Sequence, residues 1–162
     1  MERTPHRRTR PSWTTTVLAL GGLLAAPLVT ACAGVASPVA GLAGARDRWA
    51  AAGYDHYGFT LTSSCGERNL VGDFDVEVAG GEVVAVSASL AHLEMTPESY
   101  VESGGRTIDG FLDLLDERQD DVTDVAFDGD LGYPTSLTLD PMPRAIDDEE
   151  CYTITDVHPV RG

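Results

Sequence analysis

The stretch that decides the fold of this chain is residues 73–86, which read DFDVEVAGGEVVAV. Before the two glycines, apolar side chains alternate with acidic ones, and this period of two is typical of a β-strand with one buried face. A short valine-rich run follows the glycines. We predict a β-hairpin with a three-residue loop, in which Val76 pairs with Val84 and Phe74 pairs with Val86.

This register gives the predicted hairpin one apolar face and one acidic face. The acidic face carries Asp73, Asp75 and Glu77, and we interpret it as a solvated face of a sheet. Val83 and Ala85 are left on the acidic face, so the predicted sorting of side chains is imperfect.

Two helices are expected on either side of the hairpin. Apolar residues recur at helical spacing around Trp49, and Ser37-Pro38 supplies a capping residue and a first-turn proline. One helix is therefore predicted at roughly residues 39–52. Thr107 is a suitable cap for the second helix, whose apolar stripe ends near residues 118–120.

Residues 90–106 look irregular, and the rest of the chain reads as further strands. The element order is helix, three strands, helix, three strands. We predict an α+β fold, with an antiparallel sheet of about six strands and two helices packed on one face. The additional strands are expected around residues 57–65, 125–127, 136–139 and 151–157.

The first 32 residues have the order of a bacterial export signal. Four arginines precede an apolar run from Val17 to Val29, and small residues lead into Cys32. The run is about thirteen residues long, whereas a spanning helix needs roughly twenty. The order Val29-Thr30-Ala31-Cys32 resembles a lipobox, which predicts cleavage before Cys32 and acylation of its sulfur. The alternatives are a cleaved soluble protein and a retained membrane segment.

The domain boundaries follow from this signal. We expect a signal peptide at residues 1–31, a lipid-anchored tether at residues 32–38 and one domain at residues 39–162. Cleavage removes four arginines and one glutamate, so the formal net charge falls from −15 to −18. Such a domain repels nucleic-acid phosphates and anionic headgroups. We expect no nucleic-acid partner, and attachment to the bilayer only through acylated Cys32, on the extracytoplasmic face of the cell membrane.

Two cysteines remain if Cys32 carries lipid. Cys65 and Cys151 would meet an oxidising compartment outside the cell, where cysteines commonly pair. We predict a disulfide between them, and the alternative is a reactive thiol or a metal-binding pair.

The acidic run before Cys151 is the strongest candidate for a ligand or metal site. Asp147, Asp148 and Glu149 repel one another unless they are solvated or neutralised, and Ca²⁺ is the obvious neutraliser outside cells. The alternative is a solvated acidic turn. No other cofactor is indicated.

Two further sets of residues are candidate sites. Gly132-Tyr133-Pro134 is typical of a turn, with the tyrosine packed over the sheet. His56, His92 and His158 have the chemistry of bases or metal ligands, but no spacing brings the three together, and His56 is expected on the solvent side of its strand.

The combination of elements resembles an uncharacterised domain family of secreted actinobacterial lipoproteins. The resemblance extends from about Trp49 to Pro159 and implies a fold and a location, but no reaction. Members often have a second cysteine shortly after the one at Cys65, and its absence here implies pairing with Cys151. The motifs that carry the resemblance are the Cys32 lipobox, Tyr54-Asp55-His56-Tyr57, the hairpin, Thr107-Ile108-Asp109-Gly110-Phe111, Gly132-Tyr133-Pro134-Thr135 and Asp147-Asp148-Glu149.

The sequence contains no recognisable catalytic motif. It has no lysine, which excludes a Schiff-base mechanism and the usual phosphate-binding loop. We therefore expect a non-enzymatic, lipid-anchored envelope domain that binds or modulates an envelope protein or a small cationic ligand. The alternatives are a hydrolase that uses paired carboxylates and a structural envelope protein with a calcium-stabilised acidic loop.

Overall fold

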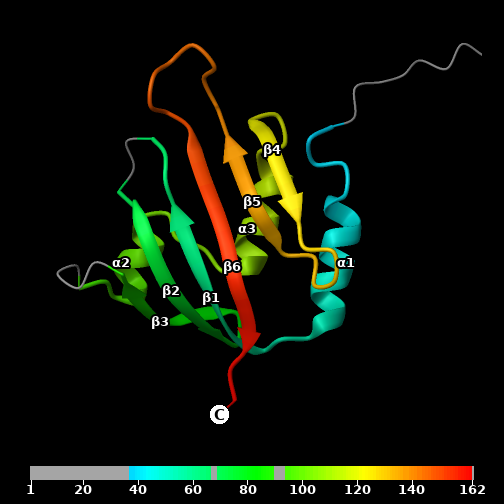
Figure 1. Ribbon diagram of the computed structural model, residues 1–162, viewed down its shortest axis with the longest axis vertical. Coiled ribbons are helices and arrows are strands. Elements are labelled where there is room, and N and C mark those ends of the chain that lie inside the picture. The colour runs from blue at the N-terminus through cyan, green and yellow to red at the C-terminus, as the bar shows by residue number, and fades with distance from the viewer. Residues whose placement is uncertain (1–36, 67–68, 90–93, 162) are drawn as a thin grey trace, which may run out of the picture. The chain divides into compact units, whose positions relative to one another are not determined.

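The computed structural model describes residues 37–66, 69–89 and 94–161 (Figure 1). The sheet in this part of the chain has six strands in the order β3-β2-β1-β6-β5-β4, and every neighbouring pair is antiparallel. The elements are α1 (Leu42–Ala52), β1 (His56–Ser63), β2 (Gly72–Ala79), β3 (Glu82–Ala88), α2 (Pro97–Glu102), α3 (Ile108–Glu117), β4 (Val122–Phe127), β5 (Pro134–Leu139) and β6 (Glu150–Pro159).

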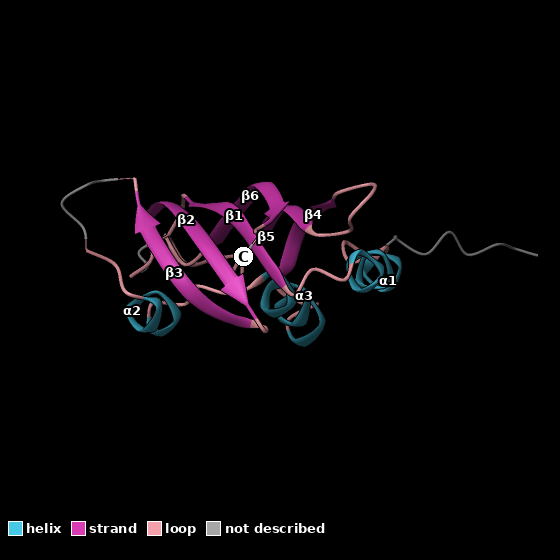
Figure 2. Ribbon diagram, turned by 90° about the horizontal axis from the view of Figure 1, so that it is seen from below, coloured by secondary structure: helices cyan, strands magenta, loops and turns pink. Residues whose placement is uncertain are grey.

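Figure 2 shows α2 and α3 on the same side of the sheet, with α1 beside α3 at the β4 edge. The predicted α+β class and the antiparallel sheet are confirmed. The predicted order was wrong in one respect, because two helices rather than one separate the two groups of three strands. None of the helices among the described residues is long and apolar enough to cross a membrane.

The centre of the sheet is β1, which pairs with β2 on one side and with β6 on the other. Its side chains alternate, so that Tyr57, Phe59 and Leu61 are buried under the helices. The hydroxyl of Tyr57 accepts a hydrogen bond from the backbone N–H of Ile108 at 3.2 Å, which ties β1 to the start of α3. Burial raises the pKa of Tyr57 to about 12, so the phenol stays protonated at neutral pH.

The hairpin forms, but its predicted register was wrong. Val76 pairs with Val86 rather than with Val84, a shift of two residues. The first comes from the loop, which is the two residues Gly80 and Gly81, both with positive φ (60° and 82°), and the second comes from a bulge. Two such residues are what a type I′ turn requires. The register then shifts between Glu77 and Val78, which leaves one extra residue in β3.

This bulge corrects the imperfect sorting of side chains that the predicted register implied. Val83 packs against the core and Ala85 stays exposed. Without the extra residue between them, these two side chains would lie on the same face of β3. The extra residue, Val84, is about half exposed (48%). The hairpin therefore separates apolar from acidic residues better than the sequence pattern suggested.

Helix α2 lies inside the segment that was predicted to be irregular. Thr96 accepts a hydrogen bond from the N–H of Ser99, the Ser99 hydroxyl accepts one from the N–H of Thr96, and Pro97 occupies the first turn. This is a capping box with an N-terminal proline. The capping signal is present in the sequence, but the helix it begins is only six residues long.

The starts of α1 and β4 differ from the predicted ones, whereas α3 begins after Thr107, as predicted. α1 begins at Leu42 rather than near residue 39, because the carbonyls of Ser37 and Val39 close tight turns before it. β4 begins at Val122, earlier than predicted, because an irregularity near Asp124 hides the alternation. α3 runs from Ile108 to Glu117, with Thr107 as its cap.

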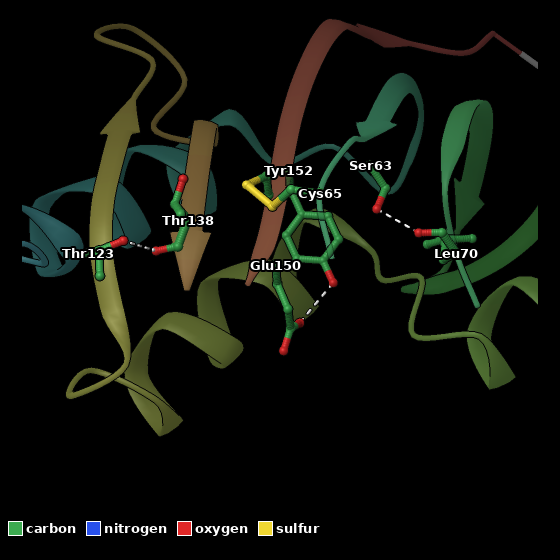
Figure 3. The surroundings of a disulfide bond; sticks show 8 residues. Ser63, Cys65, Leu70, Thr123, Thr138, Glu150 and Tyr152 are labelled. Carbon is green, nitrogen blue, oxygen red and sulfur yellow. Dashed lines mark hydrogen bonds between the residues drawn. A yellow bond between two sulfur atoms is a disulfide. The ribbon is translucent and has the colours of Figure 1, made fainter. Parts of the chain in front are cut away.

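The predicted disulfide between Cys65 and Cys151 is confirmed (Figure 3). It joins the residues that follow β1 to the start of β6, with the two Cα atoms 5.3 Å apart. The N–H of Ser64 donates to the carbonyl of Cys151, so a backbone hydrogen bond continues the β1–β6 pairing up to the bridge. The bridge fastens one end of the central strand pair.

Replacing both cysteines, as Cys65→Ser with Cys151→Ser, is expected to lower the free energy of unfolding by about 4 kcal/mol, because the unfolded chain loses a constraint across 86 residues. Chemical denaturation monitored by circular dichroism measures this. Reduction of the wild-type protein is the matched control and should give a similar loss. An unchanged denaturation midpoint in both experiments would contradict the expectation.

Candidate functional site

The face of the sheet that the helices leave open carries a row of acids on β2. Asp73, Asp75 and Glu77 point to this face because Phe74, Val76 and Val78, between and after them, are buried on the other. The predicted solvated acidic face is therefore present. Asp73 and Asp75 are exposed, and the side chain of Glu77 is 40% exposed.

Threonines on β1 orient two of these carboxylates. The hydroxyl of Thr60 donates to Oδ1 of Asp75 at 2.9 Å, and the hydroxyl of Thr62 donates to Oδ1 of Asp73 at 2.7 Å. These cross-strand pairs follow from the β1–β2 register. One oxygen of each carboxylate is thus held by its neighbour, and the group is presented in a defined orientation.

The open face is hollowed beside these acids. Gly58 lies between Glu77 on β2 and His158 on β6, and it has no side chain to fill the space. A Cβ atom at Gly58 would lie 3.0 Å from Cε1 of His158, so the imidazole forms one wall. We call this cavity of about 300 Å³ the open-face hollow. Its polar and small lining residues include Gly58, Thr60, Asp75, Glu77, Ala85, Ser87 and His158.

Two of the predicted histidines lie at this face. Nε2 of His56 is 2.6 Å from Oε1 of Glu77, and His56 is partly exposed, as expected. Nδ1 of His158 lies 2.6 Å from the backbone carbonyl oxygen of Asp156. The third, His92, lies outside the described residues, as does Cys32.

Sequence reasoning missed the place of His158 because β6 is irregular. Tyr152 and Ile154 are buried, so simple alternation along β6 would turn His158 inward. Asp156 has a positive φ of 54°, and the β1–β6 register shifts at this point. Val157 packs against the core instead, and His158 faces outward. An apolar residue at position 157 was the only signal of this change.

The acids of the open face lack an arginine partner in the part of the chain that the structure describes, although Glu77 contacts His56. In residues 37–66, 69–89 and 94–161, no arginine forms an ion pair with Asp73, Asp75 or Glu77. The arginines that do form ion pairs in this part of the chain, Arg46 and Arg118, lie elsewhere. The site therefore suits a positively charged group supplied from outside.

The acidic run that was predicted as a ligand or metal site lies in the loop between β5 and β6. Asp147 is exposed with a φ of 67°, and Asp148 and Glu149 are half-buried. No group of three or more histidine, cysteine or acidic side chains among the described residues is arranged to hold a metal ion. Calcium binding at this loop stays a prediction from the sequence.

The next acid, Glu150, has a structural environment. It is 7% exposed, and its Oε1 accepts a hydrogen bond from Arg118 at 2.6 Å. Its Oε2 accepts one from the hydroxyl of Tyr152 at 2.9 Å (Figure 3). Arg118 also donates to Asp121 at 2.8 Å. The ion pair between Arg118 and Glu150 therefore joins the end of α3 to the first residue of β6.

The Gly132-Tyr133-Pro134 motif packs against α1. Gly132 has a φ of 82°, and a Cβ atom there would overlap the backbone carbonyl of Ala45. Tyr133 packs on the core and Pro134 begins β5. The motif therefore lets the β4–β5 loop approach α1 closely.

Comparison with known proteins adds one finding. A family model described as a family of unknown function, DUF6174, matches residues 41–159. The chain belongs to this family. The DUF6174 match begins one residue before α1 and ends with β6, so it covers all the helices and strands above. No curated protein and no solved structure matches the chain.

Replacing the buried acid of this DUF6174 domain, as Glu150→Gln, is expected to lower the free energy of unfolding by roughly 2 kcal/mol, since it leaves Arg118 without its closest carboxylate. Urea denaturation measures the change. The control is Glu149→Gln, which removes the same charge one residue earlier and is expected to change stability by less than about 0.5 kcal/mol. Equal effects of the two variants would contradict a structural role specific to Glu150.

Proposed function

We propose that this chain is a lipid-anchored, extracytoplasmic DUF6174 domain that binds a cationic ligand on its open sheet face. The observation that carries the proposal is the row Asp73, Asp75 and Glu77, which lies beside the open-face hollow without an arginine partner among the described residues. The chemistry is non-enzymatic recognition of ammonium or guanidinium groups.

The spacing of the acids supports an extended peptide as the ligand. Alternate residues of a strand are about 7 Å apart, so the three carboxylates form a straight line at that interval. An extended segment of an envelope protein with basic residues at every second position would match this interval. One exposed ion pair contributes about 1 kcal/mol or less, so affinity depends on engaging several of them together.

The Thr60 and Thr62 hydroxyls support the same conclusion. They hold the carboxylates of Asp75 and Asp73 in place before a ligand arrives, which reduces the side-chain entropy that binding would cost. Ala85 and Ser87 on β3 are small, so they leave the carboxylates on β2 accessible from that side.

The cellular location in this proposal rests on the amino-terminal sequence. Acylation of Cys32 would place the domain outside the cytoplasm, with residues 32–38 as the tether. The formal charge of −18 after cleavage would repel anionic headgroups, so the lipid alone would hold the domain at the bilayer.

We do not extend the proposal to hydrolysis. A pair of catalytic carboxylates needs one acid with a raised pKa close to a second acid. The buried acid of the run, Glu150, is instead bound by Arg118 at 2.6 Å.

Acylation predicts that the protein incorporates a radiolabelled fatty acid in a bacterial host, and that Cys32→Ser abolishes the label because the acceptor sulfur is gone. Labelling followed by gel analysis of membrane and soluble fractions measures this. Cys65→Ser is the control and should keep the label. Unlabelled wild-type protein in the cytosol with its initiator methionine would contradict the proposed location.

Ligand binding predicts that the full chain, in an uncharged detergent, binds a fluorescent hexalysine peptide, and that Asp75→Asn with Glu77→Gln weakens binding about fivefold because two ion pairs are lost. Fluorescence anisotropy at low salt measures the affinity. Glu117→Gln with Asp120→Asn, two exposed acids on and just after α3, removes the same charge from the helical side. If both double variants weaken binding equally, the peptide responds to net charge and the open face is not the site.

A further inference from the structure

A second cavity lies on the helical side of the sheet, where α1 ends and where β1 and α3 begin. Figure 1 shows the chain turning from the end of α1 into β1 at this end of the sheet. The cavity has a volume of about 290 Å³. We call it the corner pocket, and its lining residues are Trp49, Ala50, Gly53, Tyr54, Asp55 and Asp109.

Two aromatic rings form a right-angled wall of the corner pocket. The rings of Trp49 and Tyr54 have centroids 5.8 Å apart and an interplanar angle of 84°. Trp49 also contacts Tyr57 at 5.1 Å with an angle of 83°, and it is 5% exposed, so its position is fixed by packing. Aromatic faces attract cations through their quadrupole, and most strongly in the case of tryptophan.

Two aspartates complete the lining of the pocket. Asp55 and Asp109 are exposed, and neither forms an ion pair with an arginine among the described residues. The backbone of Asp55 is held in place because its carbonyl accepts a hydrogen bond from the N–H of Gly80 in the hairpin turn at 2.9 Å. Asp109 is fixed by its place in the first turn of α3.

The cations of α1 are directed away from this pocket. Arg46 donates to Asp113 at 2.9 Å and to the carbonyl of Leu112 at 2.8 Å, and Arg48 reaches the carbonyl of Asp128 at 3.5 Å. The last turn of α1 has no basic residue. The terminal carbonyls of α1 add partial negative charge at this corner and the first turn of α3 adds partial positive charge, so the net charge of the pocket comes from its aspartates.

From this arrangement we propose that the corner pocket binds an alkylated ammonium group. A weakly hydrated organic cation gains from the aromatic wall as well as from the carboxylates, whereas a small inorganic cation keeps its water and gains only from the charge. No group of three or more histidine, cysteine or acidic side chains at this corner, or elsewhere among the described residues, is arranged to hold a metal ion. The corner pocket shares no lining residue with the open-face hollow.

The fluorescence of Trp49 provides a direct test. The sequence contains two tryptophans, Trp13 and Trp49, so the full chain with Trp13→Phe reports on Trp49 alone. This protein is titrated with tetramethylammonium chloride in an uncharged detergent, and potassium chloride at the same ionic strength is the reference. We expect a saturable change in emission with tetramethylammonium and only a linear drift with potassium.

Variants separate the corner pocket from general charge effects. Asp55→Asn with Asp109→Asn is expected to weaken tetramethylammonium binding about fivefold, and Tyr54→Leu to weaken it by a similar factor through loss of one ring. Glu117→Gln with Asp120→Asn is the matched control and should leave the titration unchanged. Equal responses to potassium and tetramethylammonium, or unchanged binding in both corner variants, would overturn the proposal.

The outcome is distinguishable from that of the open-face proposal. Asp75→Asn with Glu77→Gln is expected to leave the tetramethylammonium titration unchanged while it weakens binding of hexalysine. If this variant abolishes the emission change, the cation acts at the open face and the corner pocket is not a binding site.

Discussion

The pairing of β1 with β6 is the interaction on which the rest of the structure depends. It joins the amino-terminal hairpin sheet to the carboxy-terminal strands, and the disulfide fastens one end of it. Alternation along β1 then sends Tyr57, Phe59 and Leu61 under the helices. The same alternation places Gly58, Thr60 and Thr62 on the open face. One strand therefore contributes to both the core and the candidate site.

The distribution of charge follows from how few cations the domain has. The chain has 11 basic residues, all arginine, against 26 acids, and four of the arginines precede Val17. Arg46 and Arg118 serve helix packing, where each joins α3 to another element. The carboxylates of β2 and of the corner pocket have no such partner among the described residues. A surplus of acids that the fold leaves uncompensated supports recognition of cations supplied by a ligand.

The sequence pattern predicted the elements better than their registers. Alternation and capping signals predicted the hairpin and the helix that begins after Thr107, because these depend on neighbours along the chain. The sequence pattern missed two register shifts, one near Val78 and one near Asp156, whose φ is positive. Each shift moves the side chains that follow it to the opposite face of the sheet. The outward position of His158, and hence one wall of the open-face hollow, depends on such a shift.

The sequence by itself determined the fold class, the acidic face of the hairpin and the cysteine pair, since each is written in local periodicity or in residue type. Only the tertiary structure decided which acids share a surface. It placed Glu150 in a buried ion pair with Arg118 and placed Asp75 in the lining of the open-face hollow. It also brought Asp55 and Asp109, which are 54 positions apart in the chain, into the lining of the corner pocket. Convergence of this kind depends on strand order and helix packing, which no local pattern encodes.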